Sequence, residues 1–147
     1  MRLRPPDCIL RTGPNQVVST LPPAPPHGHV VILVEDDEGL RVALLRLLRA
    51  CGFSACGYAS AEALLDDPRA ARADCLVVDV HLPAMSGLEL VTRLRRRGLR
   101  VPAVAISAHD EAGVREAARD QGIERFLAKP FLGRALASAV SELIAGR

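Results

Sequence analysis

Short runs of branched apolar residues alternate, from His29 onward, with segments in which apolar residues recur every three or four positions. The short runs predict strands, and the recurring spacing between them predicts helices. Five strands are expected, at residues 30–34, 53–57, 75–78, 101–106 and 125–128. The second of these runs has the weakest apolar pattern.

The strongest helical pattern lies between the first two runs. Five apolar residues share one face of this helix: Leu40, Leu44, Leu47, Leu48 and Cys51. The arginines of the same segment should then point outward: Arg41, Arg46 and Arg49.

Helices are also predicted after the later runs. Ser86 and Glu89 have the spacing of a capping box, so the third helix should begin near Gly87. The last helix repeats the apolar spacing at four leucine and valine positions: Leu132, Leu136, Val140 and Leu143. The second and fourth helices, expected to begin near Ser60 and Asp110, contain fewer large apolar residues.

Strands that are apolar on both faces and separated by helices require a parallel sheet that is covered on both sides. Right-handed crossovers then favour an α/β domain of the flavodoxin-like type, with five strands in the order 2-1-3-4-5. In such sheets ligands bind beyond the carboxyl ends of the strands.

Polar residues follow most of the predicted strands. Glu35 and Asp36 follow the first, Asp79 the third, Ser107 the fourth and Lys129 the fifth. Three carboxylates gathered at one edge would repel one another by roughly several kcal/mol unless a proton or cation intervenes. Oxygen ligands without His or Cys suit Mg²⁺, which usually binds one or two carboxylates, water and phosphate oxygens. The set therefore indicates a phosphoryl-transfer site.

Lys129 strengthens this interpretation because it is the only lysine among 19 basic residues. A compact ammonium can pair with a carboxylate and then with a phosphoryl oxygen, whereas arginine presents a planar fork. The position therefore favours an amine.

The bulk composition offers little support for a nucleic-acid or membrane partner. The net charge of +2 arises from three arginines and one aspartate within residues 1–28. Aromatic residues make up 3% of the chain, which leaves little to stack on bases. The arginines from Arg93 to Arg100 fit either a nucleic-acid stripe or, as we interpret them, a solvated helix end whose dipole favours cations.

Residues 1–28 contain seven of the eleven prolines and no periodic apolar pattern, which predicts a disordered, Pro-rich extension before one domain at 29–147. Four cysteines lack metal-ligand spacing, and Cys51 and Cys75 fall in apolar segments, as expected of core residues in a reducing compartment. No segment has the length of a membrane span or signal peptide, so a cytoplasmic protein is expected.

Four segments, VILVEDDEGLR, CLVVDVHLPAMSGLEL, AISAHD and FLAKPF, resemble the receiver domains of two-component response regulators, in particular FixJ-type receivers. The resemblance spans residues 29 to about 146, with gaps of 43, 28 and 22 residues between Asp36, Asp79, Ser107 and Lys129. It implies a phosphorelay protein that is no enzyme beyond Mg²⁺-dependent self-phosphorylation and autodephosphorylation.

The resemblance also implies a role for each acid. Asp79 would be the phospho-acceptor, converted to 4-aspartylphosphate by a sensor histidine kinase or phosphotransfer protein. Mg²⁺ would be bound by Asp36 and Asp79 directly, by Glu35 through water and by the backbone carbonyl of His81. An alternative is that Asp36 caps the first helix together with Asp37; we assign Asp36 as ligand and Asp37 as cap.

For the phosphoryl group itself, the resemblance implies contacts from Ser107 and Lys129, and a cis Lys129–Pro130 peptide. Ser107 could instead be a turn residue. On phosphorylation Ser107 and Phe126 would act as the switch, and helix four, strand five and helix five would contact a downstream protein or form a phosphorylation-dependent homodimer. His81 and His109 are either exposed bystanders or set the phosphoryl lifetime by controlling water access.

Three other functions fit these residues less well. A Mg²⁺-dependent hydrolase would need a second acid/base, which only the histidines offer, and a flavodoxin would need a phosphate-cradling loop where EDDEGL is acidic. A phosphorylation-independent pseudo-receiver that only binds partners would be expected to have lost an acid or the lysine. FixJ-type receivers usually precede a DNA-binding domain, and none follows Arg147, so we expect a stand-alone receiver.

Overall fold

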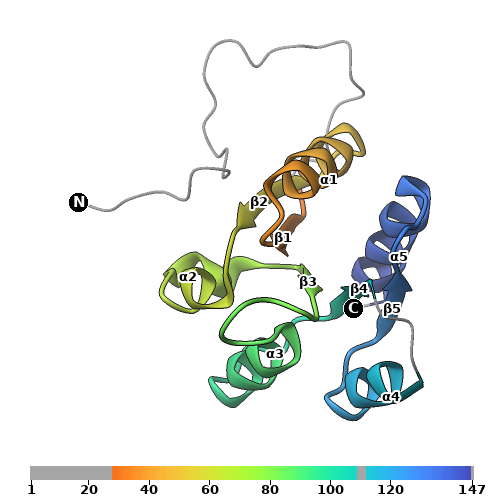
Figure 1. Cartoon of the computed structure of the whole chain (residues 1–147). Coiled ribbons are helices and arrows are strands. Elements are labelled where there is room, and N and C mark those ends of the chain that lie inside the picture. Colours follow the sequence, from red (N-terminus) through yellow and green to blue (C-terminus); the bar gives the residue numbers. More distant parts are fainter. Residues whose placement is uncertain (1–27, 109–111, 147) are drawn as a thin grey trace.

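The structure is a computed structural model that describes residues 28–108 and 112–146 (Figure 1). Strands and helices alternate along this part of the chain, as predicted. The strands are β1 (Val30–Val34), β2 (Ser54–Tyr58), β3 (Cys75–Asp79), β4 (Ala103–Ser107) and β5 (Arg125–Ala128). The helices are α1 (Glu38–Ala50), α2 (Ala61–Leu65), the 3₁₀ turn η1 (Pro68–Arg72), α3 (Gly87–Arg96), α4 (Ala112–Asp120) and α5 (Gly133–Ala145).

The five strands form one parallel sheet in the order β2-β1-β3-β4-β5, which confirms the predicted flavodoxin-like topology. The predicted bounds of β1 and β5 are correct, whereas β4 begins at Ala103 rather than at 101. Pro102 has no N–H to donate to a ladder, and its carbonyl accepts the Leu76 N–H at 2.9 Å just before β4 starts.

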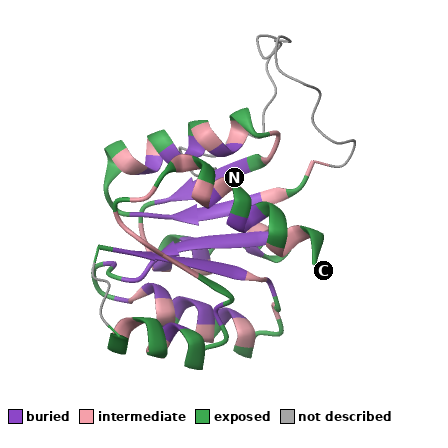
Figure 2. Ribbon diagram, turned by 90° about the vertical axis from the view of Figure 1, so that its right-hand side faces the viewer, coloured by how far each residue is buried: buried purple, intermediate pink, exposed green. Residues whose placement is uncertain are grey.

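Helices cover both faces of the sheet (Figure 2). One apolar cluster lies between the sheet and α1 and α5, with Leu33, Leu48 and Leu136 among its buried members. The other lies between the sheet and α2, α3 and α4, and includes Ile32 and Leu90. Successive residues of β1 enter opposite clusters, as the two-residue period of a strand requires, so the central strands are buried on both sides.

Side-chain oxygens cap the N-termini of three α-helices. Asp37 accepts the Leu40 N–H at 3.1 Å at the start of α1, and Ser86 accepts the Glu89 N–H at 3.1 Å at the start of α3. Ser60 caps α2 in the same way. The predicted starts of α2 and α3, and Asp37 as the cap of α1, are thereby confirmed.

Three predicted side-chain placements are wrong. Arg41 does not point outward but is buried, because the buried face of α1 runs through positions 41, 44, 45 and 48. Cys51 is exposed because it follows the last turn of α1, whereas Cys75 is buried as expected. Leu132 is not part of α5 but its N-terminal cap, with 62% of its surface exposed.

Two segments with sequence-based predictions lie outside the described residues. They are residues 1–27, most of the expected Pro-rich extension, and residues 109–111, which contain His109 and the expected start of the fourth helix. Within the described part of the chain, no helix is long and apolar enough to cross a membrane.

Candidate functional site

Three carboxylates meet where β1 and β3 end. Glu35 and Asp36 follow β1 directly, and Asp79 is the last residue of β3. One oxygen from each of the three side chains lies within 4.8 Å of the others. Glu35 and Asp79 are buried, whereas Asp36 is exposed. The structure therefore brings together the three acids that the sequence predicted at this edge.

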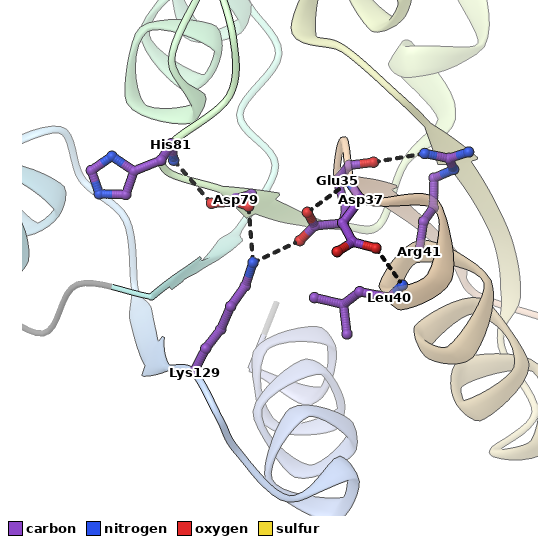
Figure 3. A network of polar contacts seen from close by, with 7 residues as sticks. All are labelled: Glu35, Asp37, Leu40, Arg41, Asp79, His81 and Lys129. Carbon is purple, nitrogen blue, oxygen red and sulfur yellow. Dashed lines mark hydrogen bonds and ion pairs between the residues drawn. The ribbon is translucent and has the colours of Figure 1, made fainter.

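The Lys129 amine reaches two of these acids from the end of β5 (Figure 3). Its Nζ donates to Glu35 Oε1 at 3.1 Å and to Asp79 Oδ2 at 3.0 Å. The Lys129–Pro130 peptide is cis, as the resemblance implied. The sheet order places β5 two strands away from β3, so the long lysine side chain spans the intervening end of β4.

Burial raises the pKa of Glu35 to about 7, with the charge of Asp79 adding to the rise and hydrogen bonds from Asp37 N–H and Lys129 opposing it. Burial alone would lower the pKa of Lys129, but its hydrogen bonds to Asp79 and Glu35 outweigh that effect and raise it. The lysine is therefore charged at neutral pH. One ammonium facing three carboxylates leaves the cluster short of positive charge.

The backbone after β3 fixes the other oxygen of Asp79. The His81 N–H donates to Asp79 Oδ1 at 2.9 Å, while the His81 side chain is exposed and directed away from the acids (Figure 3). Both carboxylate oxygens of Asp79 thus have a defined donor, one from the backbone and one from Lys129.

Gly87 allows helix α3 to begin directly against Asp79. A Cβ atom at position 87 would lie 2.2 Å from the Asp79 carbonyl oxygen, so only glycine fits without a shift of the backbone. The Gly87 N–H donates to Val80 O at 3.1 Å, which closes the loop between β3 and α3. The capping box predicted this helix start, but no local pattern indicated that Gly87 contacts Asp79.

Ser107 and Phe126 lie on the neighbouring strands. Ser107, the last residue of β4, is buried, and its carbonyl accepts the Lys129 N–H at 2.7 Å. Phe126 lies on β5 and packs against the cluster beneath α2, α3 and α4. The Arg115 guanidinium of α4 stands 4.6 Å from the centre of its ring. The aromatic side chain thus connects β5 to α4.

Arg41 is a further buried charge next to the acids, and sequence reasoning missed it. Its Nη1 donates to the backbone carbonyl of Glu35 at 2.9 Å. A signal was present, because position 41 is three residues before Leu44 and seven before Leu48, which places it on the apolar face of α1.

The chemistry of the site fits a hard divalent cation such as Mg²⁺. Its donors are carboxylate oxygens with no sulfur or imidazole ligand among them. The exposed Asp36 leaves an open side where water or phosphate oxygens can complete the coordination. Two buried acids, one exposed acid and one fixed ammonium suit a reaction in which charge on transferred oxygens must be neutralised.

Comparison with known proteins gives a consistent result. Residues 31–141 match the family model of the response regulator receiver domain. The chain is 35% identical over 111 residues to Nodulation protein W of Bradyrhizobium diazoefficiens, which covers 76% of this chain and 49% of that protein. It is 33% identical over 115 residues to the transcriptional regulatory protein FixJ of Azorhizobium caulinodans, covering 78% and 54%.

Among solved structures, a response regulator receiver protein from Burkholderia phymatum superposes with a TM-score of 0.70 at 37% identity, covering 80% of this chain and 95% of that one. The similarity thus extends over nearly the whole of that receiver. In contrast, the chain spans about half the length of the curated relatives it matches.

Proposed function

This chain belongs to the response regulator receiver domain family of two-component systems, and on that premise we propose that it accepts a phosphoryl group on Asp79. Receiver domains interact with histidine kinases or phosphotransfer proteins and with downstream effectors. We place the receiver at residues 29–147, after an extension at 1–28. The observation that carries the proposal is the Asp79 carboxylate, held between the Lys129 amine at 3.0 Å and the His81 N–H at 2.9 Å within a cluster of acids.

In the proposed reaction, an Asp79 carboxylate oxygen attacks the phosphorus of a phosphohistidine on the partner. The new O–P bond forms an acyl phosphate as the P–N bond breaks, and the imidazole nitrogen keeps the electron pair and takes up a proton. Catalysis consists of positioning and of neutralising charge on the transferred oxygens. Lys129 is already hydrogen-bonded to the Asp79 carboxylate. On phosphorylation its amine would bond a phosphoryl oxygen instead.

The metal ligands are proposed to be Asp36, Asp79, Glu35 through water, and the backbone carbonyl of His81. Receiver domains generally use Mg²⁺, which when bound neutralises negative charge on the phosphoryl oxygens. The Glu35 carboxylate has a fixed orientation at this site, because Lys129 donates to one of its oxygens and the Asp37 N–H to the other, at 3.1 Å each.

We further propose Ser107 and Phe126 as the residues that change on phosphorylation. Ser107 would hydrogen-bond the phosphoryl group and Phe126 would then move inward, altering the surface of α4, β5 and α5. This surface would contact a downstream protein, with a phosphorylation-dependent homodimer as the alternative. A Phe126→Ala variant whose partner binding still depends on phosphorylation would contradict this assignment.

The side chains of His81 and His109 are proposed to set the phosphoryl lifetime through water access. The exposed position of the His81 imidazole beside the Asp79 loop supports this for one of the two. Replacing each histidine with alanine and timing dephosphorylation tests the idea, and an unchanged half-life for both variants contradicts it.

The central test is the intact mass of the protein after incubation with Mg²⁺ and acetyl phosphate. We expect the wild type to gain one phosphoryl group that hydroxylamine removes, and Asp79→Asn to gain none. Asp74→Asn is the matched control, because Asp74 precedes the same strand at its opposite end. If the wild type stays unmodified with both acetyl phosphate and a phosphohistidine donor, the proposal fails, and a phosphorylation-independent interaction module becomes the better interpretation.

A further inference from the structure

We infer that Arg41 is a positioning residue for the divalent-cation site, because it fixes the backbone from which Glu35 and Asp36 project. The inference rests on the proposed function, since it concerns the same acids. Arg41 acts on these acids through the backbone, because its Nη1 donates to the Glu35 carbonyl.

The burial of Arg41 is the first observation. Only 9% of its surface is exposed, although it belongs to the first turns of α1 close to the edge of the sheet. Arginine is rarely buried unless it is paired, because removing a guanidinium from water is costly. Its Nη1 is directed to the Glu35 carbonyl at 2.9 Å, which is the backbone oxygen immediately before Asp36.

The Glu35 backbone is consequently held on both sides. Its N–H donates to Tyr58 O on β2 at 3.0 Å, and its carbonyl accepts from Arg41. Because the peptide bond is planar, fixing the Glu35 carbonyl also fixes the orientation of the Asp36 N–H and restricts where the Asp36 side chain can point. Asp36 is exposed and has no burial to hold it, so its placement depends on the backbone.

Strand β2 has a glycine, Gly57, at the position next to the Arg41 side chain. A Cβ atom at Gly57 would lie 3.2 Å from both Cγ and Cδ of Arg41, and 2.7 Å from a Leu45 methyl carbon. Glycine weakens a strand interior and often marks a close approach by another group. Gly57 thus leaves room for the side chains of both Leu45 and Arg41 on the neighbouring helix.

The choice of a backbone acceptor has a chemical consequence. Lys129 neutralises the acids by bonding two carboxylate oxygens, whereas Arg41 approaches from the other side of Glu35 and bonds its carbonyl (Figure 3). The bond from Arg41 therefore brings positive charge and rigidity to the acid loop through a backbone oxygen. Groups that orient metal ligands in this way typically contribute about 10-fold to 100-fold to metal affinity.

Arg49 provides a matched control on the same helix. Its Nε and Nη2 donate to the Ala55 carbonyl of β2 at 3.3 and 2.9 Å, so it also ties α1 to a backbone oxygen. Ala55 lies near the start of β2, away from the carboxyl edge. Both arginines stabilise the packing of α1, but Arg49 is bonded to the amino half of β2, whereas Arg41 is bonded to the acid loop.

The test is the Mg²⁺ dissociation constant of the full chain, measured by isothermal titration calorimetry for wild type, Arg41→Met and Arg49→Met. We expect Mg²⁺ binding to weaken roughly tenfold or more in Arg41→Met and to stay at the wild-type value in Arg49→Met. An unchanged dissociation constant in Arg41→Met, or equal weakening in both variants, overturns the inference. If circular dichroism shows Arg41→Met to be unfolded, Arg41→Gln and Arg49→Gln take its place with the same criteria.

These outcomes also separate this inference from the proposed function. A wild type that binds no Mg²⁺ overturns both. A wild type that binds Mg²⁺ and is phosphorylated on Asp79, together with an Arg41→Met variant of unchanged affinity, overturns only the role of Arg41.

Discussion

Carboxylates lie at both ends of the parallel sheet, but their surroundings differ between the two ends. At the amino ends, Asp74 accepts the Val30 N–H at 2.8 Å and Glu124 accepts the Ala103 N–H at 2.8 Å. Each of these acids precedes one strand and binds the first N–H of the neighbouring strand. At the carboxyl ends, three acids face one another, and two of them, Glu35 and Asp79, share Lys129.

The difference shows which carboxylates serve the fold. Each amino-end acid has its own basic side chain nearby, His29 at 3.7 Å from Asp74 and Arg95 at 3.5 Å from Glu124, and remains partly exposed to solvent. The carboxyl-end acids are crowded and, at Glu35, almost fully buried. Crowding of like charges costs stability unless a ligand relieves it. The crowded acids at the carboxyl ends are therefore better explained by cation binding than by a contribution to stability.

The largest expected effect comes from adding one methyl group at the carboxyl edge. Gly87→Ala places a Cβ 2.2 Å from the Asp79 carbonyl oxygen, so α3 or the end of β3 must move. We expect the free energy of unfolding to fall by about 3 kcal/mol, as in severe overpacking, and phosphorylation to slow sharply. Urea unfolding and the intact-mass assay measure the two effects.

Gly113→Ala is the control for this substitution, because nothing lies within 4 Å of a Cβ atom built on Gly113 in α4. There the methyl group should raise the stability by about 0.5–1 kcal/mol, since alanine is the better helix former. Equal effects at both positions would mean that the close approach at Asp79 does not constrain the site.

Replacing one acid at each end of the sheet with alanine tests whether only the acids at the carboxyl ends bind Mg²⁺. With Mg²⁺ at about a hundred times its dissociation constant, the wild type should gain about 2.7 kcal/mol in free energy of unfolding. Asp36→Ala should lose most of this gain. Glu124→Ala should start about 1–2 kcal/mol lower, because the Ala103 N–H loses its acceptor, yet keep the full gain. A Glu124→Ala variant that no longer responds to Mg²⁺ would contradict the distinction between the two ends.

The pH dependence of Mg²⁺ binding sharpens the same contrast. Burial raises the pKa of Glu35 from 4.5 to about 7, so without metal the folded protein holds this proton more tightly than the unfolded chain. Stability without Mg²⁺ should therefore fall as the pH rises from about 4.5 through 7. Mg²⁺ affinity should rise with pH, by up to about tenfold per unit below 7, because the proton and the ion compete. Calorimetry at several pH values should show this slope in wild type and a flat profile in Glu35→Gln.

Much of this arrangement could be predicted from the sequence because strand ends are easy to locate. The apolar run before Asp79 and the apolar run before Lys129 each stop at a charged or turn-forming residue, and topology then places both ends at one edge. The predicted meeting of Glu35, Asp36, Asp79 and Lys129 needed no knowledge of side-chain conformation.

The placement of Arg41 could not be predicted in the same way. A charged residue on an apolar face is normally assigned to solvent, whereas Arg41 donates to a backbone carbonyl and lies beside Gly57 of another strand. No local pattern connects residues 41 and 57. The prediction for Leu132 was wrong because its helical spacing to Leu136 placed it in α5, whereas α5 begins one residue later.

The smallest expected effect concerns backbone strain in the loop that carries Asp79 into α3. Ala84 has a φ of 64°, in the left-handed region that disfavours side chains. Ala84→Gly should relieve this conformation but also loosen the unfolded chain, so the net gain in stability should be about 1 kcal/mol or less. Ala63→Gly is the control, since Ala63 is another exposed alanine but lies within α2, where glycine should cost about 0.5–1 kcal/mol. Opposite signs in urea unfolding would place the strain in the carboxyl-edge loop, as expected where a functional site dictates the backbone. A loss of stability in both variants would show that the Ala84 backbone carries no strain that glycine can relieve.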